Sequence, residues 1–167
     1  MYFPESLVNR LNQNNYTITT AESCTGGMIA SSITAVPGSS NCFKEGFVTY
    51  SNEAKIKNLG VLPETIDRYG VVSANVAGEM AQGVLVRTSA DFSLSVTGVA
   101  GPDGGTVETP VGRVYIGCAF GSEIRVIERT YKGDRHEVRQ QTVVDAFQLL
   151  ESCMDYYEGI NESNSRK

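Results

Sequence analysis

The sequence of 167 residues contains no tryptophan and a single histidine, His136. It has four cysteines, and no two of them show the C-x-x-C spacing of a zinc site or a redox pair: Cys24, Cys42, Cys118 and Cys153. Most of these thiols are expected to be small buried apolar side chains. The scarcity of histidine and of paired cysteines therefore argues against zinc binding and dithiol chemistry.

Positive charge is also scarce. The 14 Lys and Arg residues are outnumbered by 19 Asp and Glu residues, which gives a formal net charge of -5, and no basic cluster is dense enough to follow a phosphate backbone. No apolar run reaches the roughly 18 residues of a membrane-spanning helix. The first residues lack the basic and apolar regions of a secretory signal. We therefore expect a cytoplasmic protein that binds neither nucleic acid nor membrane.

Several common catalytic motifs are missing as well. No G-x-G-x-x-G opens a helix after the first strand, and there is no P-loop. Tyr50 and Lys55 are five positions apart rather than the four of the short-chain dehydrogenase pair, and Ser51 to Lys55 is one residue too long for an S-x-x-K motif. The glycines between 98 and 105 precede a strand, so they do not form a helix-capped dinucleotide fingerprint.

Strand-like and helix-like segments alternate along the chain. Residue type and alternation predict strands at 16–20, 43–51, 91–97, 111–120 and 124–131, the last two forming a hairpin. Apolar periodicity and capping residues predict helices at 4–14, 28–35, 52–59 and 63–69, then from Ser73 and from about 134 to 157. These segments predict one α/β domain over residues 1–157, with a mixed sheet of about five strands and helices on both faces. A polar, frayed tail is expected at 158–167.

The segment from Thr19 to Gly27 joins the first predicted strand to a buried helix. Ser23 to Thr25 lie where strand becomes helix, so the unpaired first amides of that helix would lie beside them. Gly26 and Gly27 would let a ligand approach the backbone closely. Helix capping alone could also explain the serine and the threonine, because both are favoured N-cap residues.

Two further segments are expected at the same edge of the sheet. Tyr50 and Lys55 flank the second strand-to-helix junction, and Thr97 ends the third strand before a glycine-rich loop. Ligands of α/β sheets gather beyond the carboxyl ends of the strands, and loops there often touch them. We therefore expect the three segments to share one site.

The residue types at this site favour nucleophilic catalysis with a lysine base. A Ser-His-Asp triad would require His136, and nothing near it suggests a partner for Ser23. A neutral lysine can accept a serine proton when burial or a nearby positive charge lowers its pKa. We expect Lys55 to be this base and Tyr50 to hydrogen-bond to it or to the serine, with Cys24 as an alternative nucleophile. Lysines on short helices are more often solvated and strand tyrosines more often pack, so both roles depend on the fold.

Three motifs occur in order: Thr20-Ala21-Glu22-Ser23-Cys24-Thr25-Gly26-Gly27, Gly46-Phe47-Val48-Thr49-Tyr50-Ser51-Asn52-Glu53-Ala54-Lys55, and Thr97-Gly98-Val99-Ala100-Gly101-Pro102-Asp103-Gly104-Gly105 before Pro110-Val111-Gly112. Together they resemble the C-terminal domain of the CinA family, the nicotinamide-nucleotide amidohydrolase domain. Gly133-Asp134-Arg135 and Val138-Arg139 extend the resemblance over nearly the whole chain.

The resemblance implies a three-layer α/β/α sandwich with a mixed, mostly parallel sheet. It also implies hydrolysis of the carboxamide of nicotinamide mononucleotide to nicotinic acid mononucleotide and ammonia, in pyridine nucleotide recycling. Ser23 would be the nucleophile, Lys55 the base and Tyr50 the helper, with no metal and no cofactor.

The remaining site residues are expected to bind the substrate or its charged intermediates. Amides of the turn after Ser23 would hold the oxyanion: Cys24, Thr25, Gly26 and Gly27. The substrate phosphate would meet loop amides and a guanidinium, from Gly101, Gly104, Gly105, Arg135 and Arg139. Thr97 would offer a hydroxyl to the substrate, and Glu22 could hold the lysine.

Two rival functions follow from the same residues. A catalytically silent paralogue would keep the pocket as a pyridine-nucleotide-binding or regulatory module. A DNA-repair or competence accessory would need a basic surface, which this acidic sequence does not provide. The hairpin leaves an exposed sheet edge, so a homo-oligomer is expected.

Overall fold

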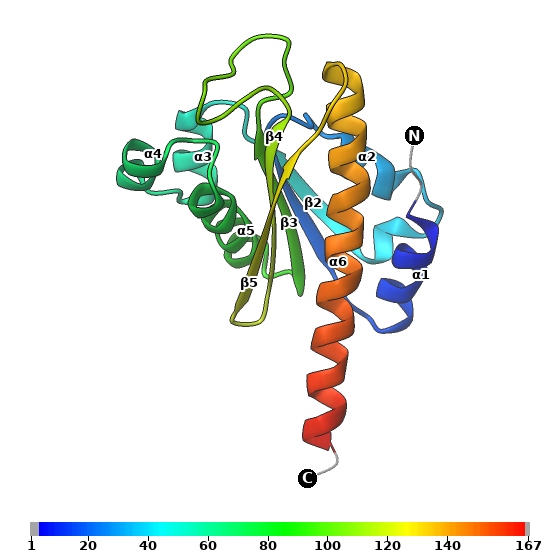
Figure 1. Ribbon diagram of the computed structural model, residues 1–167. Helices are drawn as coiled ribbons and strands as arrows, with labels where there is room; N and C mark the ends of the chain where they lie inside the picture. The colour runs from blue at the N-terminus through cyan, green and yellow to red at the C-terminus, as the bar shows by residue number, and fades with distance from the viewer. Residues whose placement is uncertain (1–3, 166–167) are drawn as a thin grey trace.

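The computed structural model describes residues 4–165, which form a five-stranded sheet covered by helices on both faces (Figure 1). The strand order is β2-β1-β3-β4-β5, and the strands are β1 (Ile18–Glu22), β2 (Phe43–Val48), β3 (Phe92–Gly98), β4 (Arg113–Phe120) and β5 (Glu123–Thr130). β1 pairs in parallel with β2 and β3, whereas β4 pairs antiparallel with both β3 and β5. The sheet is therefore mixed, with β4 alone running against the direction of the other strands.

The six α-helices within residues 4–165 are divided between the two faces, which confirms the three-layer architecture (Figure 1). One face carries α1 (Glu5–Gln13), α2 (Met28–Thr34) and the long α6 (Arg135–Ser165). The other carries α3 (Asn52–Leu59), α4 (Pro63–Tyr69) and α5 (Ala74–Thr88). A 3-10 turn, Ser39–Asn41, precedes β2. No helix within residues 4–165 combines the length and the apolar content needed to span a bilayer.

The central strand β3 shows how the two layers differ. Phe92, Leu94 and Val96 point into the apolar core beneath α1, α2 and α6. The alternate side chains face α5, and two of them donate hydrogen bonds to its backbone: Ser93 Oγ to Ala81 O at 2.8 Å and Ser95 Oγ to Ala77 O at 2.6 Å. These hydroxyls are buried but satisfied, so they bring the helix close to the sheet without leaving unpaired polar atoms.

The helices of the second layer also pack closely against each other. A Cβ atom at Gly83 of α5 would lie 1.8 Å from the carbonyl oxygen of Leu59, the last residue of α3. No side chain fits in that space, so glycine sets the distance between α5 and α3. The position of α3 matters because this helix carries Lys55.

Most predicted helix boundaries are confirmed, and the capping residues explain why. Ser51 and Ser73 accept hydrogen bonds from the amides of Ala54 and Val76, and each begins a helix as predicted. Gly60 ends α3 in the left-handed conformation, with φ of 70°.

Four predicted elements had a boundary that was wrong by two residues or more. β2 ends at Val48 rather than at 51, and β4 begins at Arg113 rather than at 111. β1 lies two residues later than expected, at Ile18–Glu22, because Glu22 still pairs with Val48 of β2 and Val96 of β3. The last helix does not end near Tyr157 but continues through the predicted tail to Ser165.

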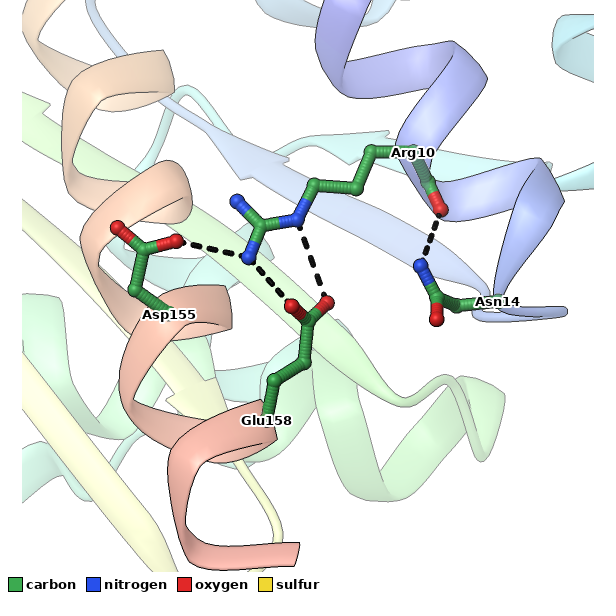
Figure 2. Close-up of polar contacts among 4 residues, drawn as sticks. All are labelled: Arg10, Asn14, Asp155 and Glu158. Carbon is green, nitrogen blue, oxygen red and sulfur yellow. Dashed lines mark hydrogen bonds and ion pairs between the residues drawn. The ribbon is translucent and has the colours of Figure 1, made fainter. Parts of the chain in front are cut away.

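Contacts with the N-terminal helix hold α6 to the fold near the end predicted for it. Arg10 of α1 donates to both oxygens of Glu158 and forms an ion pair with Asp155 at 2.7 Å (Figure 2). The ring of Tyr157 also packs edge-on against Phe92 and Tyr16. The polar composition of 158–167 predicted a frayed end, but Glu158, the first residue of that segment, is paired with Arg10 of α1.

Candidate active site

Ser23 and Lys55 meet at the carboxyl end of β1. Lys55 Nζ lies 2.9 Å from Ser23 Oγ and donates a hydrogen bond to it, although the residues are 32 positions apart in sequence. Ser23 follows β1 directly, and its amide donates to Val96 O of β3. Lys55 is in the first turns of α3, which begins at the Ser51 cap. The sheet and two helix starts thus bring an alcohol and an amine into contact.

Lys55 is buried, which is unusual for a lysine. Its side chain is 1% exposed, and Nζ also donates to the carbonyl oxygen of Thr49 at 2.8 Å. Burial lowers the pKa of Lys55 to about 8, because an ammonium ion loses hydration in the protein interior. The amine is still mostly protonated near neutral pH, but far more of it is neutral than in a solvated lysine. The expectation of a solvated lysine does not apply at this position.

Glu22 does not hold the lysine. Its fully buried carboxylate instead accepts hydrogen bonds from the amides of Gly27, Ile29 and Ala30 at 3.0, 3.0 and 2.9 Å. These are the first amides of α2, so Glu22 occupies the position at the helix N-terminus where an anionic ligand would otherwise bind.

The turn between β1 and α2 therefore offers few free donors. The amide of Gly26 donates to Ser23 O and the amide of Gly27 to Glu22, so neither is available to a ligand. Among the residues that the structure describes, the amides of Cys24 and Thr25 donate to no other residue, and the Cys24 amide lies against its own thiol. Of the four amides expected to hold an oxyanion, these two remain available.

The thiol of Cys24, next to Ser23, is buried and is a poor nucleophile. Cys24 is 5% exposed, and burial raises the pKa of its thiol to about 11. A thiol with a raised pKa carries little thiolate at neutral pH, and thiolate is the nucleophilic form. These properties favour Ser23 over Cys24 as the nucleophile.

The two arginines of the predicted phosphate site lie on α6 and have different contacts. Arg135 donates to the Tyr50 hydroxyl and to Gly101 O, both at 2.8 Å. Arg139 donates through Nε to Cys24 O and through Nη2 to Thr25 O, both at 3.0 Å. Arg139 therefore holds the turn that carries Ser23, whereas Arg135 bridges the Tyr50 segment and the glycine-rich loop.

Tyr50 and Thr97 do not make the contacts expected of them. Tyr50 is 61% exposed, and its hydroxyl meets Arg135 rather than Ser23 or Lys55. Thr97 points to the other side of β3, where its buried hydroxyl donates to Val71 O at 2.9 Å. The sequence predicted that Thr97 would lie at the edge of the sheet where Ser23 lies, but it did not predict which way the Thr97 side chain would face.

The glycine-rich loop folds back on itself above this edge of the sheet, next to the first turn of α6 (Figure 1). Gly101 and Gly104 adopt positive φ angles of 82° and 88°. A Cβ atom at Gly105 would lie 2.7 Å from the backbone nitrogen of Val111, so this glycine lets the two arms of the loop touch. Glycine is therefore required here for chain conformation.

A cavity of about 620 Å³ lies between this loop and the start of α6. Its volume is within the range of small-molecule sites. Ser23 and Lys55 are not among its lining residues, but Arg139, which does line it, contacts the turn that carries Ser23. The lining residues are Ala100, Pro102, Val111, Gly133, Asp134, Arg135, His136 and Arg139. Within residues 4–165 no group of three or more metal-ligating side chains comes together.

Two contributors to the site were missed or misassigned from the sequence. The Thr49 carbonyl that accepts from Lys55 gives no side-chain signal at all. Glu22 could have been recognised as a cap, because α2 begins without any Ser, Thr, Asp or Asn at its N-cap position, which is Gly27.

Comparison with known proteins gives a consistent result. The family model of the CinA C-terminal domain matches residues 2–154. A curated relative from Acetivibrio thermocellus, named for competence-damage induction, is 53% identical over 137 residues, which cover 82% of this chain and 33% of that protein. A CinA-like protein of Fusobacterium nucleatum is 51% identical over 140 residues, which cover 84% of this chain and 34% of that one. The chain thus spans about a third of the length of the curated relatives it matches.

Solved structures share the fold as well. A CinA superfamily protein of Escherichia coli superimposes with a TM-score of 0.85 at 37% identity, covering 88% of this chain and 86% of its own. The competence/damage inducible protein CihA of Agrobacterium tumefaciens superimposes with a TM-score of 0.85 at 40% identity, covering 91% of this chain and 98% of its own. The chain belongs to the CinA C-terminal domain family.

Proposed function

We propose that this domain hydrolyses the carboxamide of nicotinamide mononucleotide to nicotinic acid mononucleotide and ammonia. The observation that carries the proposal is the buried hydrogen bond between Lys55 Nζ and Ser23 Oγ. A serine needs a base to become nucleophilic, and a lysine whose pKa is lowered to about 8 can serve as one. The single histidine, His136, lies on α6 at the cavity, which neither residue of the pair lines.

The first half-reaction forms an acyl-enzyme. The lone pair of neutral Lys55 accepts the Ser23 proton across the 2.9 Å contact while Ser23 Oγ bonds to the amide carbon. The charge that develops on the carbonyl oxygen meets the free amides of Cys24 and Thr25. Each such donor contributes on the order of 3 kcal/mol to lowering the barrier. The Lys55 ammonium then gives its proton to the amino group, the C–N bond breaks, and ammonia leaves.

The second half-reaction releases the acid. Water attacks the ester carbon, Lys55 takes a proton from the water, and the same two amides again bear the oxyanion. The ester C–O bond breaks and Ser23 Oγ recovers its proton from Lys55. The net reaction consumes one water molecule for each amide, and the enzyme returns to its starting state.

The nucleotide part of the substrate fits the cavity beside the turn. Arg135 lies at this cavity and its guanidinium can form a bidentate contact with a phosphate. In the structure it donates to Tyr50 and Gly101 instead, so a phosphate would compete for these donors. Tyr50 acts in this proposal through Arg135, and a helping role at Ser23 would require its hydroxyl to leave the arginine.

The test is to incubate the purified protein with nicotinamide mononucleotide and to measure both ammonia and nicotinic acid mononucleotide. Stoichiometric release of the two products, lost in Ser23→Ala, is the expected result. Saturable binding of the nucleotide without any ammonia would instead favour the pyridine-nucleotide-binding module.

The expected homo-oligomer is a further proposal. It rests on the two outer strands of the sheet, β2 and β5, each of which has one edge without a strand partner among the described residues. Light scattering during size-exclusion chromatography measures it, and a monomer at assay concentration would contradict it.

A further inference from the structure

Arg139 donates hydrogen bonds to two backbone carbonyl oxygens. From the second turn of α6 it reaches across to the turn after β1, more than a hundred positions earlier in sequence, and donates to Cys24 O and Thr25 O at 3.0 Å each. A guanidinium is a rigid, planar group, so Nε and Nη2 can each meet one of two neighbouring carbonyls, whereas a lysine would have to reach both from a single nitrogen.

The contact with the Cys24 carbonyl determines the direction of the Thr25 amide. In a trans peptide the C=O and the following N–H point in opposite directions. When Arg139 holds the Cys24 carbonyl, it therefore also fixes the Thr25 N–H, which points away from the arginine. The Ser23 carbonyl is fixed in the same manner by the Gly26 amide, and this orients the Cys24 N–H.

The rest of the turn is held from its other side. The Glu22 carboxylate accepts hydrogen bonds from the amides of Gly27, Ile29 and Ala30, so the backbone beyond the turn cannot rotate freely. Arg139 also packs close to Gly26, where a Cβ atom would lie 3.3 Å from Nη2. Between these two charged groups, the peptides of Cys24 and Thr25 have one orientation, and their N–H groups donate to no other residue among those described.

We propose that Arg139 is a positioning residue, which sets the direction of the Thr25 amide so that it can stabilise an oxyanion at Ser23. This inference rests on the proposed Ser23 chemistry, and it differs from the expectation that Arg139 binds the substrate phosphate. A phosphate ligand contributes to substrate binding alone, whereas a residue that orients an oxyanion donor acts on any acylating reagent. The two roles therefore give different results with a reagent that has no nucleotide.

The experiment uses a small alkyl fluorophosphonate, which forms an O–P bond with an activated serine and releases fluoride. Its phosphoryl oxygen needs the same amide donors as an amide substrate. The rate of labelling at Ser23, measured by mass spectrometry, is compared between wild type, Arg139→Lys and Arg129→Lys. Arg129 on β5 pairs with Asp145 of α6 at 2.8 Å. Arg129→Lys therefore measures the general effect of replacing an arginine that contacts α6 by lysine.

Arg139→Lys is expected to slow labelling at least about tenfold, because a small misplacement of a catalytic group or the loss of one oxyanion donor has effects of this size or larger. Arg129→Lys is expected to label at nearly the wild-type rate. With nicotinamide mononucleotide, Arg139→Lys should lower kcat by a similar factor and leave KM nearly unchanged. Unchanged labelling together with a raised KM would overturn the inference and make Arg139 a phosphate ligand.

Two further outcomes separate this inference from the proposed function. If wild type is labelled at Ser23 but releases no ammonia from the nucleotide, the amidase proposal fails, and slower labelling of Arg139→Lys still supports the positioning role. If wild-type Ser23 is not labelled at all, the positioning role is overturned. Folding is checked by circular dichroism, and should Arg139→Lys unfold, Arg139→Gln, which keeps a single amide donor, is measured in the same way with the same criteria.

Discussion

Lys55 donates a hydrogen bond to Ser23 Oγ at 2.9 Å in an environment that leaves the lysine side chain 1% exposed. This contact joins α3 to the turn after β1, and a second hydrogen bond to Thr49 O fixes the amine in place. The burial of this lysine beside the serine has consequences for the pH dependence of turnover, for the free energy of unfolding and for the effect of substitutions elsewhere in the fold.

The first prediction concerns the pH dependence of turnover. Burial lowers the pKa of Lys55 to about 8, and only the neutral amine can accept the serine proton. We expect kcat/KM for nicotinamide mononucleotide to rise with pH and to level off above about pH 8. Initial rates measured from about pH 6 to about pH 9.5 test this. A profile that is flat over this range would exclude Lys55 as the base.

The second prediction concerns the stability cost of the same burial. The pKa of Lys55 is lowered in the folded state, so the unfolded chain binds more protons between about pH 8 and about pH 10.5, and stability rises with pH in that window. Lys55→Met removes this dependence. Relative to the variant, wild type should gain roughly 2 kcal/mol in free energy of unfolding between about pH 7 and about pH 10. Urea unfolding of both proteins at the two pH values measures the difference, and a constant difference would contradict the burial argument.

The third prediction concerns the buried carboxylate of Glu22, which accepts from three amides of α2. In Glu22→Gln an NH2 group replaces one oxygen and faces a backbone donor, and the negative charge at the helix N-terminus is lost. We expect the free energy of unfolding to fall by about 2–4 kcal/mol. Glu53→Gln is the matched control, because Glu53 is in the first turn of α3 and is exposed. Equal effects of the two substitutions in urea unfolding would contradict the capping role.

The fourth prediction tests the packing that positions Lys55. Gly83→Ala places a methyl group 1.8 Å from Leu59 O, so α3 and α5 must separate. We expect a loss of about 3 kcal/mol or more in stability and a loss of Ser23 reactivity in whatever fraction stays folded. Gly78→Ala in the same helix is the control, since its methyl group would meet Ile124 and Val126 at 3.6 and 3.7 Å, which is ordinary contact. Alanine also has the higher helix propensity, so this control should be as stable as wild type.

Local signals in the sequence predicted much of the fold. Pro63 and Gly70 bound a helix that runs from Pro63 to Tyr69 as predicted, and the Gly121 turn joins the predicted hairpin. Such signals act within a few residues, so they need no knowledge of the rest of the chain. The convergence of Ser23 and Lys55 was also predicted, because the carboxyl ends of parallel strands meet at one edge of the sheet.

The remaining features depend on contacts between distant segments. Arg139 contacts the Ser23 turn only because α6 lies beside α2, and neither segment indicates the other in sequence. The direction of the Thr97 side chain follows from which face of β3 receives α5. The pairing of Asp155 and Glu158 with Arg10 joins α6 to a helix near the opposite end of the chain.

The most direct test of the account is mass spectrometry of the protein during turnover of nicotinamide mononucleotide, with the reaction quenched in acid. The account predicts a nicotinoyl-nucleotide adduct on Ser23 that is absent in Ser23→Ala and is formed normally in Cys24→Ala. An adduct on Cys24, or ammonia release by Ser23→Ala at the wild-type rate, would contradict it.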